Sequence, residues 1–134
     1  QDDRYLAPEV HNKQQQDLSG KKKADAWSFG IVVWEMFSCR APFESVPTTA
    51  LATVIGAGDD RTCHPPIPAD TEFGMLKVIL LNSWFVDAKL RSSFANYTKL
   101  AADLQKEVTD ASESAEDKLA FWMTECKRWG AVNQ

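Results

Sequence analysis

The chain has 134 residues, of which 44% are hydrophobic and 25% are charged, and its formal net charge is −4. This size and composition are typical of one globular domain and exclude a collagen-like chain, a disordered tail and a membrane span, which needs about 20 consecutive apolar residues. The acidic balance argues against a general nucleic-acid-binding protein. Because the first residue is Gln rather than Met, we expect the chain to be a piece of a longer protein.

The three cysteines, Cys39, Cys63 and Cys126, are far apart in the sequence. An odd, widely spaced set is a poor disulfide framework, so we expect reduced thiols in a cytoplasmic protein. Cys63 is followed by His64, but a structural zinc site usually needs four clustered Cys or His ligands. The sequence therefore favours a chain that binds no metal.

The first half of the chain contains one long apolar segment. Residues 1–22 are predicted to be irregular. Residues 24–39 are long enough for a helix and carry apolar residues on every side, which predicts a buried central helix. A short helix is predicted to begin at Thr48 or Thr49 and to end near Gly56, before a proline-rich loop at residues 59–70.

The second half reads as three amphipathic helices. Apolar residues recur at steps of three and four over residues 71–86 and again over residues 92–108, where Ser92 or Ser93 is the expected N-cap. Residues 109–114 are small and polar and read as a linker before a last helix at about 115–129. No segment alternates like a strand, so the predicted fold class is all-α, with about five helices around the buried central one.

Three motifs follow one another along the chain. They read RYLAPEV at residues 4–10, DAWSFGIVVWEM at 25–36 and LNSWFVDAKLRSSF at 81–94. In this order they resemble the A-P-E segment, the D-x-W-S-F-G-x-x-x-W-E helix and the C-W…D…R-P-S-F segment of protein kinases. The second motif is highly specific, and its style is that of the tyrosine kinases and the tyrosine-kinase-like Ser/Thr kinases.

This resemblance implies the helical C-lobe of a kinase catalytic domain, from the A-P-E segment onward. Residues 1–108 would be the C-lobe part, 109–114 a linker and 115–134 a C-terminal helical extension. In the family the central helix is packed partly by segments that precede the A-P-E motif, so we expect this chain to expose an apolar patch. In the last helix, Trp122 and Trp129 are expected to pack on the chain's own lobe in preference to a partner.

The resemblance also implies roles for individual residues. The structural kinase motif comprises Ala7, Pro8, Glu9, Asp25, Trp27, Gly30 and Arg91. Glu9 and Arg91 are expected to form an ion pair that ties the activation segment to the lobe. Asp25 is expected to accept backbone N–H groups of the catalytic loop, whereas the residues alone favour an Asp that opens a helix and interacts with its dipole. The tryptophans at helical spacing are expected to pack in the core.

Arg4, Tyr5 and Leu6 match the segment that lines the substrate pocket in the family, and the alternative is an ordinary loop. Ser/Thr kinases of this style usually carry Gly-Thr just before this segment, and tyrosine kinases a Trp at the position of Tyr5. Neither pattern is met, and the Arg-Tyr pair favours Ser/Thr specificity over Tyr. Ser92 also departs from the family, which has Pro at this position.

Phosphoryl transfer requires a glycine-rich loop, a catalytic Asp and a metal-binding Asp, and the sequence contains no G-x-G-x-x-G, H-R-D or D-F-G. We therefore expect no catalytic residue, no metal and no cofactor in this chain, with Mg-ATP bound by its parent protein. The expected partners are the upstream part of the same kinase domain and a protein substrate or regulatory partner, without nucleic acid or a membrane span.

The function implied is that of the C-terminal part of a protein kinase that transfers the γ-phosphoryl group of ATP to protein hydroxyls. This part would supply the substrate-side platform and the scaffold of the catalytic loop. The alternatives are a pseudokinase scaffold or interaction domain without catalysis, and, more remotely, an unrelated helical adaptor.

Overall fold

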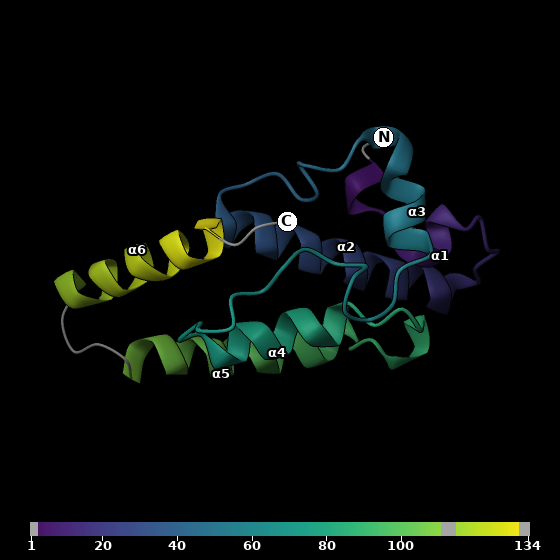
Figure 1. Ribbon diagram of the computed structural model, residues 1–134. Coiled ribbons are helices and arrows are strands. Elements are labelled where there is room, and N and C mark those ends of the chain that lie inside the picture. The colour runs from purple at the N-terminus through teal and green to yellow at the C-terminus, as the bar shows by residue number, and fades with distance from the viewer. Residues whose placement is uncertain (1–2, 111–114, 132–134) are drawn as a thin grey trace.

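The computed structural model describes residues 3–110 and 115–131, and its regular elements are all helical (Figure 1). The described α-helices are α1 (Pro8–His11), α2 (Leu18–Ser38), α3 (Leu51–Gly56), α4 (Gly74–Ser83), α5 (Phe94–Asp110) and α6 (Ala115–Ala131). Three short 3-10 helices accompany them, at Asp3–Tyr5, Thr48–Ala50 and Ala88–Leu90. The described ranges contain no strand, which confirms the all-α prediction. The additional helix, α1, lies in a segment predicted to be irregular.

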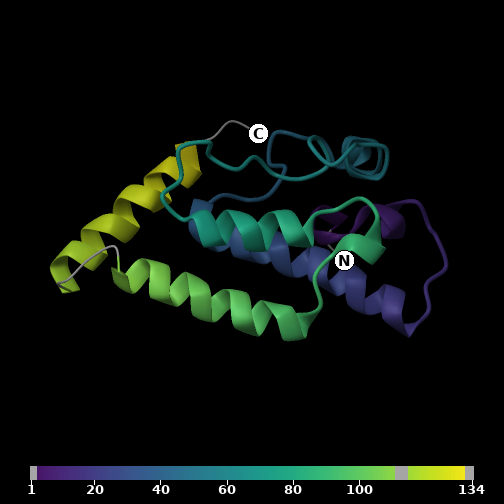
Figure 2. The same cartoon turned by 90° about the horizontal axis from the view of Figure 1, so that it is seen from below.

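The central helix of the fold is α2, which is also the longest (Figure 1). α4 runs alongside it, α5 packs against α4, and α6 meets the C-terminal end of α2 (Figure 2). Trp27, Ile31 and Trp34 on α2 are fully buried, as is Trp84 after α4. The prediction that these tryptophans pack in the core is confirmed.

The start of α2 differs from the prediction by six residues. The helix begins at Leu18 because Asp17 acts as its N-cap, and the Asp17 carboxylate accepts the backbone N–H of Gly20 at 2.7 Å. The polar turns before residue 24 carry no apolar stripe that could have indicated a helix. Asp25 therefore lies in the third turn, and the alternative interpretation, an Asp that opens the helix, is wrong.

A glycine allows α2 and α4 to approach closely. A Cβ atom added at Gly30 would lie 2.7 Å from Trp84 Nε1 and 2.8 Å from Ser83 Cβ. No side chain fits at that distance, so this position of α2 requires glycine. The contact places Trp84 against the middle of the central helix.

The N-terminus of α4 is capped by a neighbouring helix. The carboxylate of Glu107 on α5 accepts the backbone N–H groups of Gly74 and Met75, each at 2.9 Å. These two N–H groups have no partner within α4 itself. This cap explains why α4 begins at Gly74, later than the predicted residue 71, and it joins the two helices.

The ends of the other predicted helices also shifted. Thr48 and Thr49 lie in a 3-10 turn, and neither that turn nor α3 has a side-chain cap, so the predicted threonine cap is wrong. The predicted cap at the start of α5 is Ser93, whose backbone and hydroxyl oxygens accept the N–H of Asn96. Residues 109 and 110 of the expected linker continue α5, and residues 111–114 lie outside the described residues.

α6 packs on the rest of the chain through aromatic residues, as predicted. Trp122 stacks on Phe37 with ring centroids 5.2 Å apart, and Trp129 is fully buried. The buried carboxylate of Glu125 accepts hydrogen bonds from the Thr71 hydroxyl at 2.7 Å and from the Glu72 backbone N–H at 3.1 Å. α6 is therefore fixed both to the end of α2 and to the loop before α4.

One side of α2 is only partly covered by the described residues, since Phe29 contacts Phe94 and Tyr97 of α5. Phe29, Val32 and Met36 have exposed fractions of 37%, 44% and 68%. Their spacing places them on one face of the helix. This exposed stripe agrees with the patch expected for a central helix whose neighbours are only partly present. None of the helices described here is long and apolar enough to span a membrane.

Candidate functional site

The centre of the candidate site is an ion pair between Glu9 on α1 and Arg91 after Ala88–Leu90. Two parallel hydrogen bonds join the guanidinium to the two carboxylate oxygens, at 2.7 and 2.8 Å. The residues are 7% and 2% exposed. Such a bidentate geometry makes a strong, charge-assisted contact. The ion pair predicted between positions 82 residues apart is present.

Arg91 also joins segments beyond Glu9. Its guanidinium donates to the backbone oxygens of Phe85 at 2.8 Å and Lys23 at 3.0 Å, and it lies 5.2 Å above the centre of the Trp27 ring. In return, the Lys23 ammonium group donates to the backbone oxygen of Arg91. These contacts satisfy a buried charge that would otherwise be costly. They hold α1, α2 and the loop after α4 in a fixed relation.

The local sequence places Glu9 where Arg91 can reach it. Ala7 and Pro8 are buried, Ala7 is the N-cap residue of α1, and Pro8 fixes the backbone of the first helical position. Glu9 follows in the first turn. The three motif residues therefore act as a short rigid turn that directs one carboxylate inward.

The segment at residues 3–6 lies beside this pair and is held by side chains. The Tyr5 hydroxyl donates to Glu35 Oε2 at 2.6 Å, and Arg4 donates to the backbone oxygens of Phe43 and Val46. Leu6 is half-buried. The three residues predicted to line a substrate pocket thus form an ordered ledge, which we call the Arg4–Leu6 ledge.

Two α2 residues that support the ledge were not assigned a role from the sequence. The Ser28 hydroxyl donates to the Tyr5 backbone oxygen at 2.7 Å, and Glu35 accepts from the Tyr5 hydroxyl. They are seven positions apart and so lie on the same face of α2. This spacing was visible in the motif, but which residue that face contacts could not be known without the fold.

The remaining motif residues have separate places. Trp27 packs against Arg91 and Gly30 packs against Trp84, so both belong to the packing that supports the ion pair. Asp25 is exposed, and no described residue donates a hydrogen bond to its carboxylate. Its expected contact with a catalytic loop stays a prediction.

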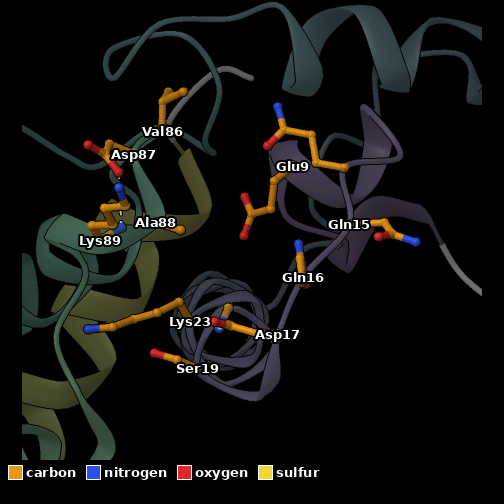
Figure 3. Close-up of a pocket in the computed structure, with 12 residues that line it drawn as sticks. Glu9, Gln15, Gln16, Asp17, Ser19, Lys23, Val86, Asp87, Ala88 and Lys89 are labelled. Carbon is orange, nitrogen blue, oxygen red and sulfur yellow. Dashed lines mark hydrogen bonds between the residues drawn. The ribbon is translucent and has the colours of Figure 1, made fainter.

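An open cleft lies next to Glu9, which is one of the residues that line it (Figure 3). Its volume is about 590 Å³, and it separates Gln14–Gln16 from Val86–Lys89, with the first turns of α2 at its base. Asp17 and Asp87 line it, but each carboxylate already caps a backbone N–H of its own segment. The amide nitrogen of Gln16 is buried and has no hydrogen-bond partner among the described residues.

The contacts of the site join segments of the chain to one another. In the part of the chain that the structure describes, no three His, Cys, Asp or Glu side chains are grouped so that they could hold a metal ion. The expectation that segments outside this chain hold Mg-ATP stays a prediction. The Glu9 carboxylate is already bound to the Arg91 guanidinium.

Comparisons with known proteins agree with the motifs. The family model described as protein tyrosine and serine/threonine kinase matches residues 2–101. Among curated proteins, mitogen-activated protein kinase kinase kinase 13 of Pongo abelii and mitogen-activated protein kinase kinase kinase 12 of Rattus norvegicus are each 30% identical over 90 residues, 67% of this chain. The dual specificity protein kinase shkE of Dictyostelium discoideum is 30% identical over 118 residues, 88% of this chain.

The chain spans only a small share of these relatives, 8%, 9% and 15% of their lengths respectively. The family match nevertheless covers all three motifs, the ion pair and the first two turns of α5. α6 lies beyond it, although it is integrated into the core. The chain therefore belongs to the protein tyrosine and serine/threonine kinase family, in its tyrosine-kinase-like branch, and corresponds to the C-terminal part of the catalytic domain.

Proposed function

We propose that this chain forms the substrate-side platform of a protein kinase whose other parts transfer the γ-phosphoryl group of ATP to protein hydroxyls. The observation that carries the proposal is the Arg4–Leu6 ledge, held onto α2 and the 43–46 loop directly before the buried Glu9–Arg91 pair. A platform of this kind contributes to catalysis by holding the acceptor in a fixed orientation. Mg-ATP would be bound by segments other than those described here.

We favour Ser/Thr over Tyr as the acceptor class, because of the Arg-Tyr pair at residues 4 and 5. The names of the relatives are compatible with either acceptor class, since one relative is a dual specificity kinase. Ser92, where the family has Pro, is compatible with the platform. Its backbone N–H donates to the Asn82 oxygen at 3.0 Å, a bond that Pro could not make.

The partners that fit this platform are a protein substrate at the ledge and the preceding part of the kinase domain at the exposed stripe of α2. Phe29, Val32 and Met36 form an apolar surface of the kind that another protein segment covers. We place the parent protein in the cytoplasm, where the three cysteines would remain reduced under most conditions.

A chimera tests this proposal. In the rat mitogen-activated protein kinase kinase kinase 12, this chain replaces the segment that matches it. Binding of an ATP analogue shows that the chimera is folded, and phosphorylation of a protein substrate shows that the platform works. We expect both. A chimera that binds the analogue but transfers no phosphoryl group would contradict the proposal and favour a scaffold without catalysis.

Variants of the chimera test the ledge itself. Arg4→Ala releases the ledge from the 43–46 loop, and we expect kcat/KM for the protein substrate to fall about tenfold or more without a change in KM for ATP. The matched control is Lys99→Ala on the exposed side of α5, which should leave both values unchanged. Equal effects of the two substitutions on kcat/KM would show that the ledge does not position the protein substrate.

A further inference from the structure

α6 meets the C-terminal end of α2 through a closely packed face. Trp122 and Trp129 both contact Phe37, with ring centroids 5.2 and 6.1 Å apart. A Cβ atom added at Gly130 would lie 2.9 Å from the backbone oxygen of Ser38. Arg40 donates to the backbone oxygen of Gly130 at 3.0 Å. The end of α2 and the last two turns of α6 are therefore in direct contact.

Each side of this contact carries a cysteine. Cys126 lies four positions after Trp122 and four before Gly130, so it occupies the face of α6 that packs against Phe37 and Ser38. Cys39 follows Ser38 and precedes Arg40, the two residues that touch Gly130. The geometry brings the two thiols to the same small region, although they are far apart in the sequence.

The electrostatics of Cys126 agree with this placement. Burial raises the pKa of its thiol, and deprotonation of Cys39 would raise it further, ahead of the adjacent Glu125. Charges interact more weakly as their separation grows, so this influence agrees with two neighbouring thiols. Cys39 is exposed and Cys126 is partly exposed, so a small solute can reach both.

We propose that Cys39 and Cys126 form a reversible disulfide that fastens α6 to the end of α2 when the chain meets a low-molecular-weight disulfide such as oxidised glutathione. The Cys39 thiolate attacks one sulfur of glutathione disulfide, which breaks the S–S bond and releases one glutathione thiolate. The Cys126 thiolate then attacks the Cys39 sulfur and releases the second. The two thiol protons pass to the two glutathiones, so the protein loses two electrons and glutathione disulfide gains two.

The third cysteine does not take part. Cys63 is fully buried in the core, and burial raises the pKa of its thiol to about 12. A dissolved disulfide cannot reach a thiol in the core, and such a thiol carries almost no thiolate, the reactive form, whereas Cys39 and Cys126 are both accessible. The bridge is therefore specific to one pair, and it closes a long loop that contains α3, α4 and α5.

The experiment exposes the full chain to oxidised glutathione, blocks the remaining thiols and identifies the linked peptides by mass spectrometry. We expect a peptide in which Cys39 is joined to Cys126, with Cys63 still free. The oxidised protein should melt roughly 5–10 °C above the reduced one, because the bond restricts the unfolded chain. Dithiothreitol should reverse both changes.

Two variants separate the bridge from other thiol chemistry. Cys39→Gly suits the left-handed backbone of this position, where φ is 54°, and Cys126→Ser keeps the size of the side chain. Each variant should form only a single glutathione adduct and show no rise in melting temperature. Glutathione adducts on both cysteines of the unaltered chain, or bridges only between two chains, would overturn the proposal.

Discussion

Gly30 shows at the residue scale how a motif position follows from packing. The absence of a side chain lets Trp84 lie against the backbone of α2, and Trp84 in turn lies beside Trp27 with ring centroids 6.5 Å apart. Trp27 carries the Arg91 guanidinium on its face. The glycine thus determines the position of the layer on which the ion pair rests.

The substitution Gly30→Ala should lower the free energy of unfolding by about 1–3 kcal/mol, because overpacking exceeds the gain in helix propensity. The measurement is urea unfolding followed by circular dichroism. Gly74→Ala is the matched control, since the only atom near its added methyl group is the Glu107 carboxylate at 3.3 Å. Equal losses in the two variants would show that α2 and α4 are not in such close contact.

His64 gives the chain a pH dependence of stability. Its ring stacks on Trp84 with centroids 4.8 Å apart, and burial lowers the pKa of the imidazole below its usual 6.5. The unfolded chain therefore takes up this proton at a higher pH than the folded chain. The contribution is fully present above pH 6.5 and is lost as the pH falls toward the lower folded value.

His64→Phe should keep the stack and remove the titration. We expect the free energy of unfolding of this variant to change less between pH 7.5 and pH 5 than that of the unaltered chain. Denaturant unfolding at several pH values measures the difference. If the free energy of unfolding of the variant depended on pH as that of the unaltered chain does, His64 would have the same pKa in the folded and unfolded states.

At the scale of elements, side chains of one helix complete another. Glu107 of α5 caps α4, and Glu125 of α6 binds the loop before α4. Each replaces backbone hydrogen bonds that the element itself cannot make. The helices of the C-terminal half are therefore fastened at their ends as well as through their apolar faces.

Glu107→Gln should cost about 1–2 kcal/mol of unfolding free energy, because an amide can accept only one of the two N–H groups and carries no charge for the helix dipole. Thermal and urea unfolding measure the loss. Asp103→Asn on the exposed side of α5 makes the same chemical change without a contact to α4. If both variants lost the same stability, the cap would have no energetic role.

The elements were predictable to the extent that their apolar pattern was regular. The helices with clear stripes, α4, α5 and α6, were placed within three residues at their ends, whereas the polar first turns of α2 and the single turn of α1 were not found. Those segments owe their helical form to Asp17 and to Pro8, which are local signals, and to contacts between distant residues. Contacts between distant residues produce no periodic spacing of apolar residues in the sequence.

For the candidate site, the motifs predicted the ion pair, and the fold supplied its surroundings. The pairing of Glu9 with Arg91 came from the resemblance to kinases, since each residue alone reads as a surface charge. The supports at Ser28, Glu35 and Lys23 could not be predicted, because they depend on which faces of α2 meet the ledge and the loop after α4. The role of Asp25 and the substrate role of the ledge stay predictions.

At the scale of the whole molecule, the chain belongs to the kinase family, but its sequence contains no G-x-G-x-x-G, H-R-D or D-F-G motif. We expect isothermal titration calorimetry of the 134-residue chain with Mg-ATP to give no binding heat, because the motifs that hold Mg-ATP in kinases are absent from its sequence. The same titration with the chimera is the positive control. Micromolar affinity of the chain alone for Mg-ATP would contradict the expectation that other segments of the parent protein bind it.

One buried pair, Glu9 with Arg91, ties the first turn of the chain to its last third. Arg91→Ala should cost more than Glu9→Ala, since Arg91 also loses its contacts to Phe85 and Lys23, and each loss should be on the order of 3–5 kcal/mol. The partly exposed pair Arg40–Glu44 is the control for the coupling alone, which we expect to be below about 1 kcal/mol, because Arg40→Ala also removes the hydrogen bond to Gly130.

A double-mutant cycle of Glu9 and Arg91 on the free energy of unfolding is the most direct test. We predict strong non-additivity: the double variant loses clearly less than the sum of the two single losses, by about 2 kcal/mol or more. Simple additivity would contradict it, because the two side chains would then not act as a pair and the ledge would not be tied to the helical lobe through them.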